Sequence, residues 1–156
     1  MTPRIDPAKY IGSGLTASLF AMGHEVEKSG LERSLFELVK IRASQLNGCA
    51  YCIDMHTKDA RARGEHEQRI YALNAWRETP FFSARERAAL EWTEALTLIA
   101  DNHVPDDLYD RVHAEFGDDA LVALTFAVLV INCWNRLSIS FRPVVGSYQP
   151  SATTAA

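Results

Sequence analysis

Residues 37–56 read ELVKIRASQLNGCAYCIDMH, and this stretch decides both the fold and the chemistry open to the chain. The apolar positions before Asn47-Gly48 nearly encircle a helix, which predicts a buried element that the Asn-Gly pair ends. A second helix begins near Cys49. Because an α-helix advances about 100° per residue, Cys49, Cys52 and His56 fall within an arc of roughly 60°. The stretch therefore predicts two thiols and an imidazole on one helical face.

On both sides of this stretch, the spacing of apolar residues is helical almost throughout. No segment alternates apolar and polar residues with a period of two, so we expect no β-sheet. We predict an all-α, single-domain helical bundle. An N-terminal arm (1–12) precedes the helical domain (13–143), and a flexible C-terminal tail (144–156) follows it. The predicted helices cover residues 13–28, 34–46, 48–63, 65–76, 83–100, 105–116 and 118–140.

Composition limits the function classes. The 156 residues are 47% hydrophobic and 23% charged, with a net charge of −4 and no basic run, so nothing predicts nucleic-acid binding. The first ten residues do not resemble a signal peptide, and the apolar run 120–131 is too short for a membrane span. Three cysteines are an odd number for a disulfide framework. We expect a cytoplasmic protein with a reversible dithiol.

The last predicted helix is apolar on nearly every face between Leu121 and Trp134. A helix that is apolar all round needs partners on all sides, which a chain of this size hardly supplies alone. We therefore expect a homo-oligomer. Within this helix we expect Cys133 to be a small buried side chain rather than a reactive thiol.

The four polar side chains of the opening stretch suit thiol redox chemistry. Cysteines in the first turn of a helix gain from its positive end, which favours the reactive thiolate. His56 can relay a proton, and Glu37, among apolar neighbours, is expected to have a raised pKa and to act as a base. A thiolate can attack a peroxide, and the second cysteine then converts the sulfenic acid into a disulfide. The dithiol is itself the redox centre, so no metal, flavin or haem is implied.

Other interpretations stay open. Cys49, Cys52 and His56 could hold structural zinc if Cys133 or Glu37 supplied a fourth ligand. An acid–base enzyme, such as a decarboxylase or isomerase, could use the carboxylate and the imidazole with the thiols as spectators. Taken singly, His56 could be a satisfied core histidine, and Glu37 could simply form an ion pair with Lys40 or Arg33.

The spacing E-x11-C-x2-C-x3-H resembles the AhpD-like, carboxymuconolactone decarboxylase superfamily, over roughly residues 31–141. The resemblance implies an all-α protein that assembles as trimers or hexamers and reduces organic hydroperoxides. It implies that Cys52 attacks the peroxide from within a pocket and that Cys49 is the more exposed, resolving thiol. Glu37 and His56 would form the proton relay, and a thioredoxin-like or lipoyl-bearing protein would supply electrons.

One position departs from the family pattern. The best-known peroxidases of the family carry a histidine just before the second cysteine, where this chain has Tyr51. Tyrosine is a poor base near neutral pH, so we expect a shorter relay and slower turnover. The C-x-x-C pair itself argues against lactone decarboxylation, since the decarboxylases of the superfamily generally lack it.

Overall fold

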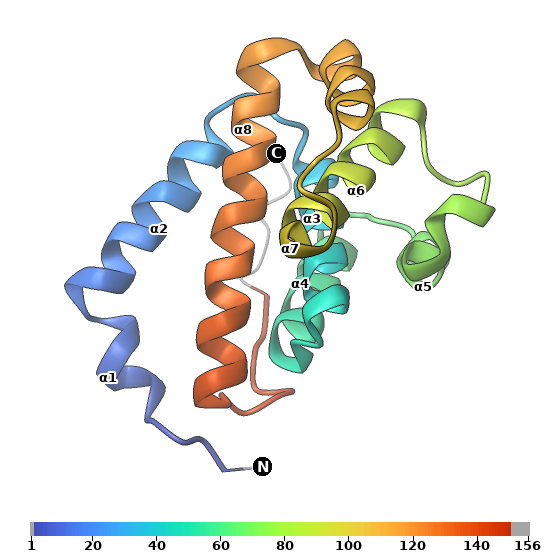
Figure 1. Ribbon diagram of the computed structural model, residues 1–156. Helices are drawn as coiled ribbons and strands as arrows, with labels where there is room; N and C mark the ends of the chain where they lie inside the picture. The colour runs from blue at the N-terminus through green and yellow to red at the C-terminus, as the bar shows by residue number, and fades with distance from the viewer. Residues whose placement is uncertain (1, 151–156) are drawn as a thin grey trace.

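The computed structural model describes residues 2–150, and all the regular elements in this range are helical (Figure 1). This confirms the predicted all-α class. The elements, in chain order, are α1 (Pro7–Ile11), α2 (Gly14–Glu27), α3 (Arg33–Asn47), α4 (Ala50–Ala62), α5 (Glu67–Ala72), the 3-10 helix η1 (Leu73–Glu78), α6 (Ala84–Thr97), α7 (Ile99–Asn102) and α8 (Asp106–Phe141).

The helix ends lie where local chemistry places them. The Ser13 hydroxyl accepts from an amide of the first turn of α2. Ser83 and Glu86 form the reciprocal capping box that their spacing predicts, at the start of α6. The two helices expected on either side of Gly117 are both present, and the segment labelled α8 joins them across a kink at this glycine, where φ is 66° and ψ is −179°.

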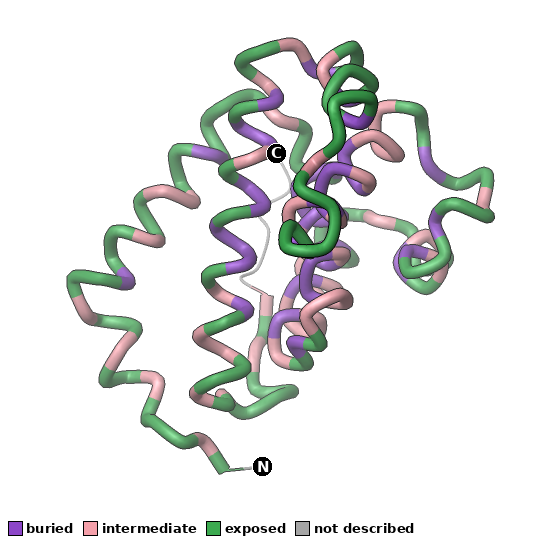
Figure 2. The backbone as a smooth tube through the Cα atoms, viewed as in Figure 1, coloured by how far each residue is buried: buried purple, intermediate pink, exposed green. Residues whose placement is uncertain are grey.

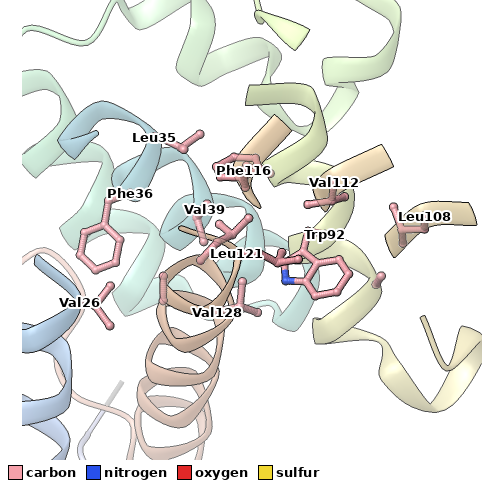
Figure 3. Packing of buried hydrophobic residues seen from close by; sticks show 14 residues of the cluster. Val26, Leu35, Phe36, Val39, Trp92, Leu108, Val112, Phe116, Leu121 and Val128 are labelled. Atoms are coloured by element: carbon pink, nitrogen blue, oxygen red, sulfur yellow. The ribbon is translucent and has the colours of Figure 1, made fainter. Parts of the chain in front are cut away.

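The main hydrophobic core lies between α3, α6 and α8, and α2 contributes Val26 to its edge (Figure 3). Trp92 of α6 is the largest side chain in this cluster, and its indole N–H donates to the Thr125 hydroxyl of α8 at 3.0 Å. Leu124 and Val128 face it from α8 and are almost completely buried. The core therefore fixes α8 against α3, the helix that carries Glu37.

A second cluster packs α3 and α4 against α5, η1 and α6. A partly buried carboxylate ties these elements together. Glu94 of α6 accepts from Arg42 at 2.7 Å, from the Trp76 indole at 2.8 Å and from Arg77 at 2.5 Å. The polar network thus holds α3 and η1 to α6 beside an otherwise apolar core.

Both ends of the described chain lie against the helical body. The predicted arm contains the short helix α1, and the Arg4 amide donates to the Phe141 carbonyl at 2.8 Å, at the end of α8. The segment 144–150, which we expected to be flexible, runs along α4. Its Gly146 amide donates to Asp54 at 3.1 Å, and its Tyr148 hydroxyl donates to Asp59 at 2.7 Å. The remainder of the predicted tail, 151–156, lies outside the described residues.

The long helix α8 is buried on one face and open on another (Figure 2). By length and composition alone it could cross a membrane, a test that core helices also pass, and half of its most apolar window is buried here. Its open face carries Val122, Phe126 and Leu129, each 42–57% exposed. Cys133 follows on this face, so the prediction that it is buried is wrong. Its side chain points away from the core because Asn132 and Asn135 occupy the inward positions.

Candidate active site

The turn between α3 and α4 places the cysteines. Gly48 ends α3 in the left-handed conformation, with φ of 69°, which a side chain would disfavour. Cys49 is the N-cap of α4, and its sulfur accepts from the Cys52 amide at 3.3 Å. Asn47 anchors the turn to α8 by donating to Asn132 at 3.0 Å and to Asn135 at 2.8 Å. The start of α4 is therefore held by both neighbouring helices.

Cys49 and Cys52 form a disulfide, as the C-x-x-C spacing predicts for a redox pair. Both cysteines are buried, each with 1% of its surface exposed. The expectation that Cys49 is the more exposed of the two therefore fails in this single chain. The N-cap position turns the Cys49 side chain back over the first turn of α4 instead of outward.

Glu37 and His56 meet next to the disulfide-bearing turn, and both are buried. His56 Nδ1 lies 3.3 Å from Glu37 Oε2, and neither atom forms a well-aligned hydrogen bond within the described chain. The other carboxylate oxygen, Oε1, accepts from Lys40 Nζ at 3.1 Å and from Arg63, which caps the far end of α4. One buried carboxylate thus faces two cations and an imidazole.

These contacts set the protonation states. Burial alone would raise the pKa of Glu37, but the contacts with His56, Lys40 and Arg63 outweigh it and lower the pKa to about 2. The prediction of a raised pKa is therefore wrong, and Glu37 is an ion rather than a proton acceptor at neutral pH. Burial lowers the pKa of His56, so its imidazole is neutral. Because Nδ1 faces the carboxylate, we assign the proton of the neutral ring to Nδ1, which leaves the lone pair on Nε2.

A cavity of about 510 Å³ opens beside these residues, between α2, α3, α4 and α8. Cys52 and His56 form part of its wall, and Tyr51 lies beside them. Most of the remaining lining is apolar or aromatic. It consists of Ile11, Leu19, Phe20, Gly23, Phe36, Met55, Ala127, Val130, Ile131 and Trp134, with His24, Glu27, Lys40 and Ser138 as the other polar members. The pocket thus suits an organic molecule with a large apolar part.

A carboxylate–imidazole group near this wall has the donor atoms of a metal site. Ligand atoms of Glu37, His56 and Asp59 lie within 4.8 Å of one another. The carboxylates are already engaged, since Glu37 pairs with two cations and Asp59 accepts from Tyr148. Burial and the bond to Asp59 raise the pKa of Tyr148 to about 12, which keeps this donor protonated. The group therefore fits a polar network better than a cation.

The structure pairs the four predicted site residues two by two, Cys49 with Cys52 and Glu37 with His56, and Cys52 and His56 share the pocket wall. Lys40, which the sequence offered as a possible partner of Glu37, is that partner, whereas the other candidate, Arg33, is not among its contacts. The contact with Arg63 was missed, because a pair separated by 26 residues leaves no periodic signal. The Asn47–Asn135 contact was missed for the same reason, since the two residues are 88 positions apart.

The sequence of this chain is similar to that of a known protein family and of two bacterial proteins. The carboxymuconolactone decarboxylase family matches residues 14–95, more than half of the chain. The uncharacterised protein YdfG of Bacillus subtilis is 53% identical over 114 residues, which cover 73% of this chain and 78% of YdfG. The uncharacterised protein YnjA of Escherichia coli is 33% identical over 78% of this chain and 66% of YnjA.

A solved structure is similar over nearly the whole length. It is that of ATU0492 from Agrobacterium tumefaciens, a protein of unknown function that has been suggested to be the antioxidant defence protein AhpD. The two chains share 40% identity with a TM-score of 0.86, over 96% of this chain and 99% of ATU0492.

Proposed function

This chain belongs to the carboxymuconolactone decarboxylase family, and we propose that it is an AhpD-like thiol peroxidase that reduces organic hydroperoxides. The observation that carries the proposal is the Cys49–Cys52 disulfide, with Cys52 in the wall of an apolar pocket beside neutral His56. A disulfide is the end product of a two-thiol peroxidase cycle, and the pocket has room for an organic peroxide.

In the proposed cycle, His56 accepts the thiol proton of reduced Cys52 through Nε2, while ionised Glu37 orients the ring and stabilises its positive charge. The Cys52 thiolate attacks the terminal peroxide oxygen, the O–O bond breaks, and a sulfenic acid and an alkoxide form. The Cys49 thiol then attacks the sulfenic sulfur and releases water. Glu37 is thus a positioning and charge-stabilising residue, and the proton acceptor is His56.

An acid–base enzyme with spectator thiols has less support. Such an enzyme would use Glu37 and His56 as its acid and base, and a carboxylate whose pKa is about 2 neither accepts nor donates a proton readily at neutral pH. A structural zinc site needs free thiolates, whereas the two nearest thiols are bonded to each other and Cys133 lies on the open face of α8.

The proposal also covers the electron donor, the oligomeric state and the cellular compartment. Electrons come from a dithiol reductant, a thioredoxin-like or lipoyl-bearing protein, because the cycle consumes two thiols per peroxide. The protein works as a homo-oligomer, a trimer or hexamer, through the apolar face of α8. It works in the cytoplasm, where such reductants keep dithiols available.

The test counts thiols in reduced, metal-free protein before and after one equivalent of cumene hydroperoxide. Wild type should lose two thiols per chain rapidly. Cys52→Ser should lose this reaction, and Cys49→Ser should stop at one sulfenic acid that dimedone traps. Cys133→Ser is the matched control and should keep the two-thiol loss. A wild-type rate no faster than that of a simple thiol would overturn the proposal.

A further inference from the structure

Lys40 occupies a position that the proposed cycle leaves without a role. Its ammonium group lies 3.1 Å from Glu37 and 3.8 Å from the centre of the Phe36 ring, and only 14% of its side chain is exposed. Lys40 lines the cavity together with Cys52 and His56, whereas Arg63, the other cation on Glu37, does not. Lys40 therefore presents a partly buried proton donor to an apolar pocket.

Peroxide cleavage needs such a donor. Displacement at an O–O bond places the attacking sulfur and the leaving oxygen on opposite sides of the attacked oxygen. The leaving group is an alkoxide, a strong base that an apolar pocket destabilises unless a proton or a cation reaches it. His56 lies one turn from Cys52 on α4 and serves the sulfur side, whereas Lys40 lines the pocket from α3.

We propose that Lys40 is a further catalytic residue, which donates a proton to the alkoxide that leaves when Cys52 attacks an organic hydroperoxide. The inference rests on the proposed peroxidase function. In this step a bond forms between the Cys52 sulfur and the terminal oxygen, and the O–O bond breaks. The sulfur is oxidised by two electrons, and the peroxide is reduced to an alcohol that carries the Lys40 proton.

The surroundings of Lys40 suit this role. When its ammonium gives up a proton, Glu37 remains paired with Arg63, so the buried carboxylate never lacks a cation. Lys40 takes a proton back from solvent, which its exposed fraction allows, and His56 releases to solvent the proton taken from Cys52. Thiol and hydroperoxide thus give sulfenic acid and alcohol, with no other reactant.

The experiment compares two oxidants that differ in their leaving group. tert-Butyl hydroperoxide releases a strongly basic alkoxide, whereas peracetic acid releases acetate, which needs no proton at neutral pH. The readout is the ratio of the two second-order rate constants for oxidation of the reduced protein. Any effect of a substitution on the Cys52 thiolate acts on both rates and cancels in this ratio.

Lys40→Gln should lower the ratio of the hydroperoxide rate to the peracid rate by roughly 100-fold, as expected for the loss of a general acid. Lys58→Gln, the matched control, removes a lysine of α4 that pairs with Asp54 and does not line this pocket, and it should leave the ratio unchanged. Lys40→Arg keeps the charge but cannot release a proton, so it should also lower the ratio. Lys40→Arg therefore tests the inference even if Lys40→Gln does not fold.

An unchanged ratio in both Lys40 variants would overturn the inference while leaving the peroxidase proposal intact. Failure of the proposed function has a different signature, because wild type would then lose two thiols with neither oxidant at more than the rate of a simple thiol.

Discussion

Glu37 lies buried between one imidazole and two cationic side chains, those of Lys40 and Arg63. Its neighbours along α3 are apolar, which alone would favour the protonated form. Lys40, Arg63 and His56 make it instead a stable buried anion with a pKa of about 2. A carboxyl group whose pKa is lower in the folded state stabilises the fold above its unfolded pKa and loses this contribution as the pH falls.

As the pH is lowered, the free energy of unfolding should therefore decrease more steeply in wild type than in Glu37→Gln. With pKa values of 4.5 unfolded and about 2 folded, the linkage relation gives an extra loss of about 2 kcal/mol between pH 6 and pH 3. Urea unfolding of both proteins at each pH measures this difference in the free energy of unfolding. Other carboxylates with lowered pKa values, such as Glu94 and Glu86, are common to both proteins and cancel. Parallel pH curves would show that Glu37 is not held as an anion.

At the residue scale, the sequence was sufficient to predict contacts that depend only on local spacing. Cys49, Cys52 and His56 share a face of α4 because their separations are three and four residues, and Lys40 reaches Glu37 across one turn. It was insufficient for contacts between helices. The pKa direction was wrong because it depends on Arg63 and His56, which only the packing of α4 on α3 brings to Glu37.

At the scale of elements, α8 depends on the backbone of Gly117. With φ of 66° and ψ of −179°, this residue kinks the helix in a conformation that side chains rarely adopt. No neighbouring atom lies within 4 Å of a Cβ placed there, so the cost of a substitution is one of backbone strain alone.

Gly117→Ala should destabilise the protein by about 1–3 kcal/mol, the typical cost of such strain. Gly14→Ala is the matched control, because Gly14 also lacks close neighbours but has an ordinary φ, and it should be neutral or slightly stabilising. Thermal or urea unfolding of the two variants decides the matter. Equal stabilities would mean that the kink does not depend on glycine.

Element boundaries were predictable wherever a cap residue marks them, as at Ser13 and Ser83, because the cap chemistry is local. The break in α8 at Gly117 was predictable as well, since a glycine after an aromatic residue reads as a stop signal. The contacts made by segment 144–150 were not predicted. Its contacts with Asp54 and Asp59 lie about 90 residues away in the chain and leave no trace in its composition.

At the scale of the whole molecule, the open face of α8 is the feature that one chain does not explain. Val122, Phe126 and Leu129 follow one another at spacings of four and three residues and form an apolar stripe on the surface. Their exposure agrees with the sequence-based argument that α8 is apolar on more sides than one subunit can cover. The stripe is the surface that we propose for contact between subunits.

Leu129→Glu should shift the protein toward monomers, because the substitution removes roughly 2 kcal/mol of apolar burial and places a charge in the contact. Tyr71→Glu, at an exposed aromatic of α5 outside the stripe, should leave the assembly unchanged. Light scattering after size exclusion reports both masses. A wild type that is monomeric at micromolar concentration would contradict the assembly itself.

The burial of the disulfide has a consequence for the kinetics of its reduction. In the proposed cycle a peroxide would reach Cys52 through the pocket, but a protein reductant would find only 1% of either cysteine at the surface. The turn around Gly48 and Cys49 must therefore open before a protein reductant can reach either sulfur. This opening does not depend on the reductant. The rate of reduction should therefore reach a plateau as the reductant concentration rises, and two unrelated dithiol proteins should reach the same plateau. That common limit would be the opening rate of the turn, measured by stopped-flow as a property of this chain alone.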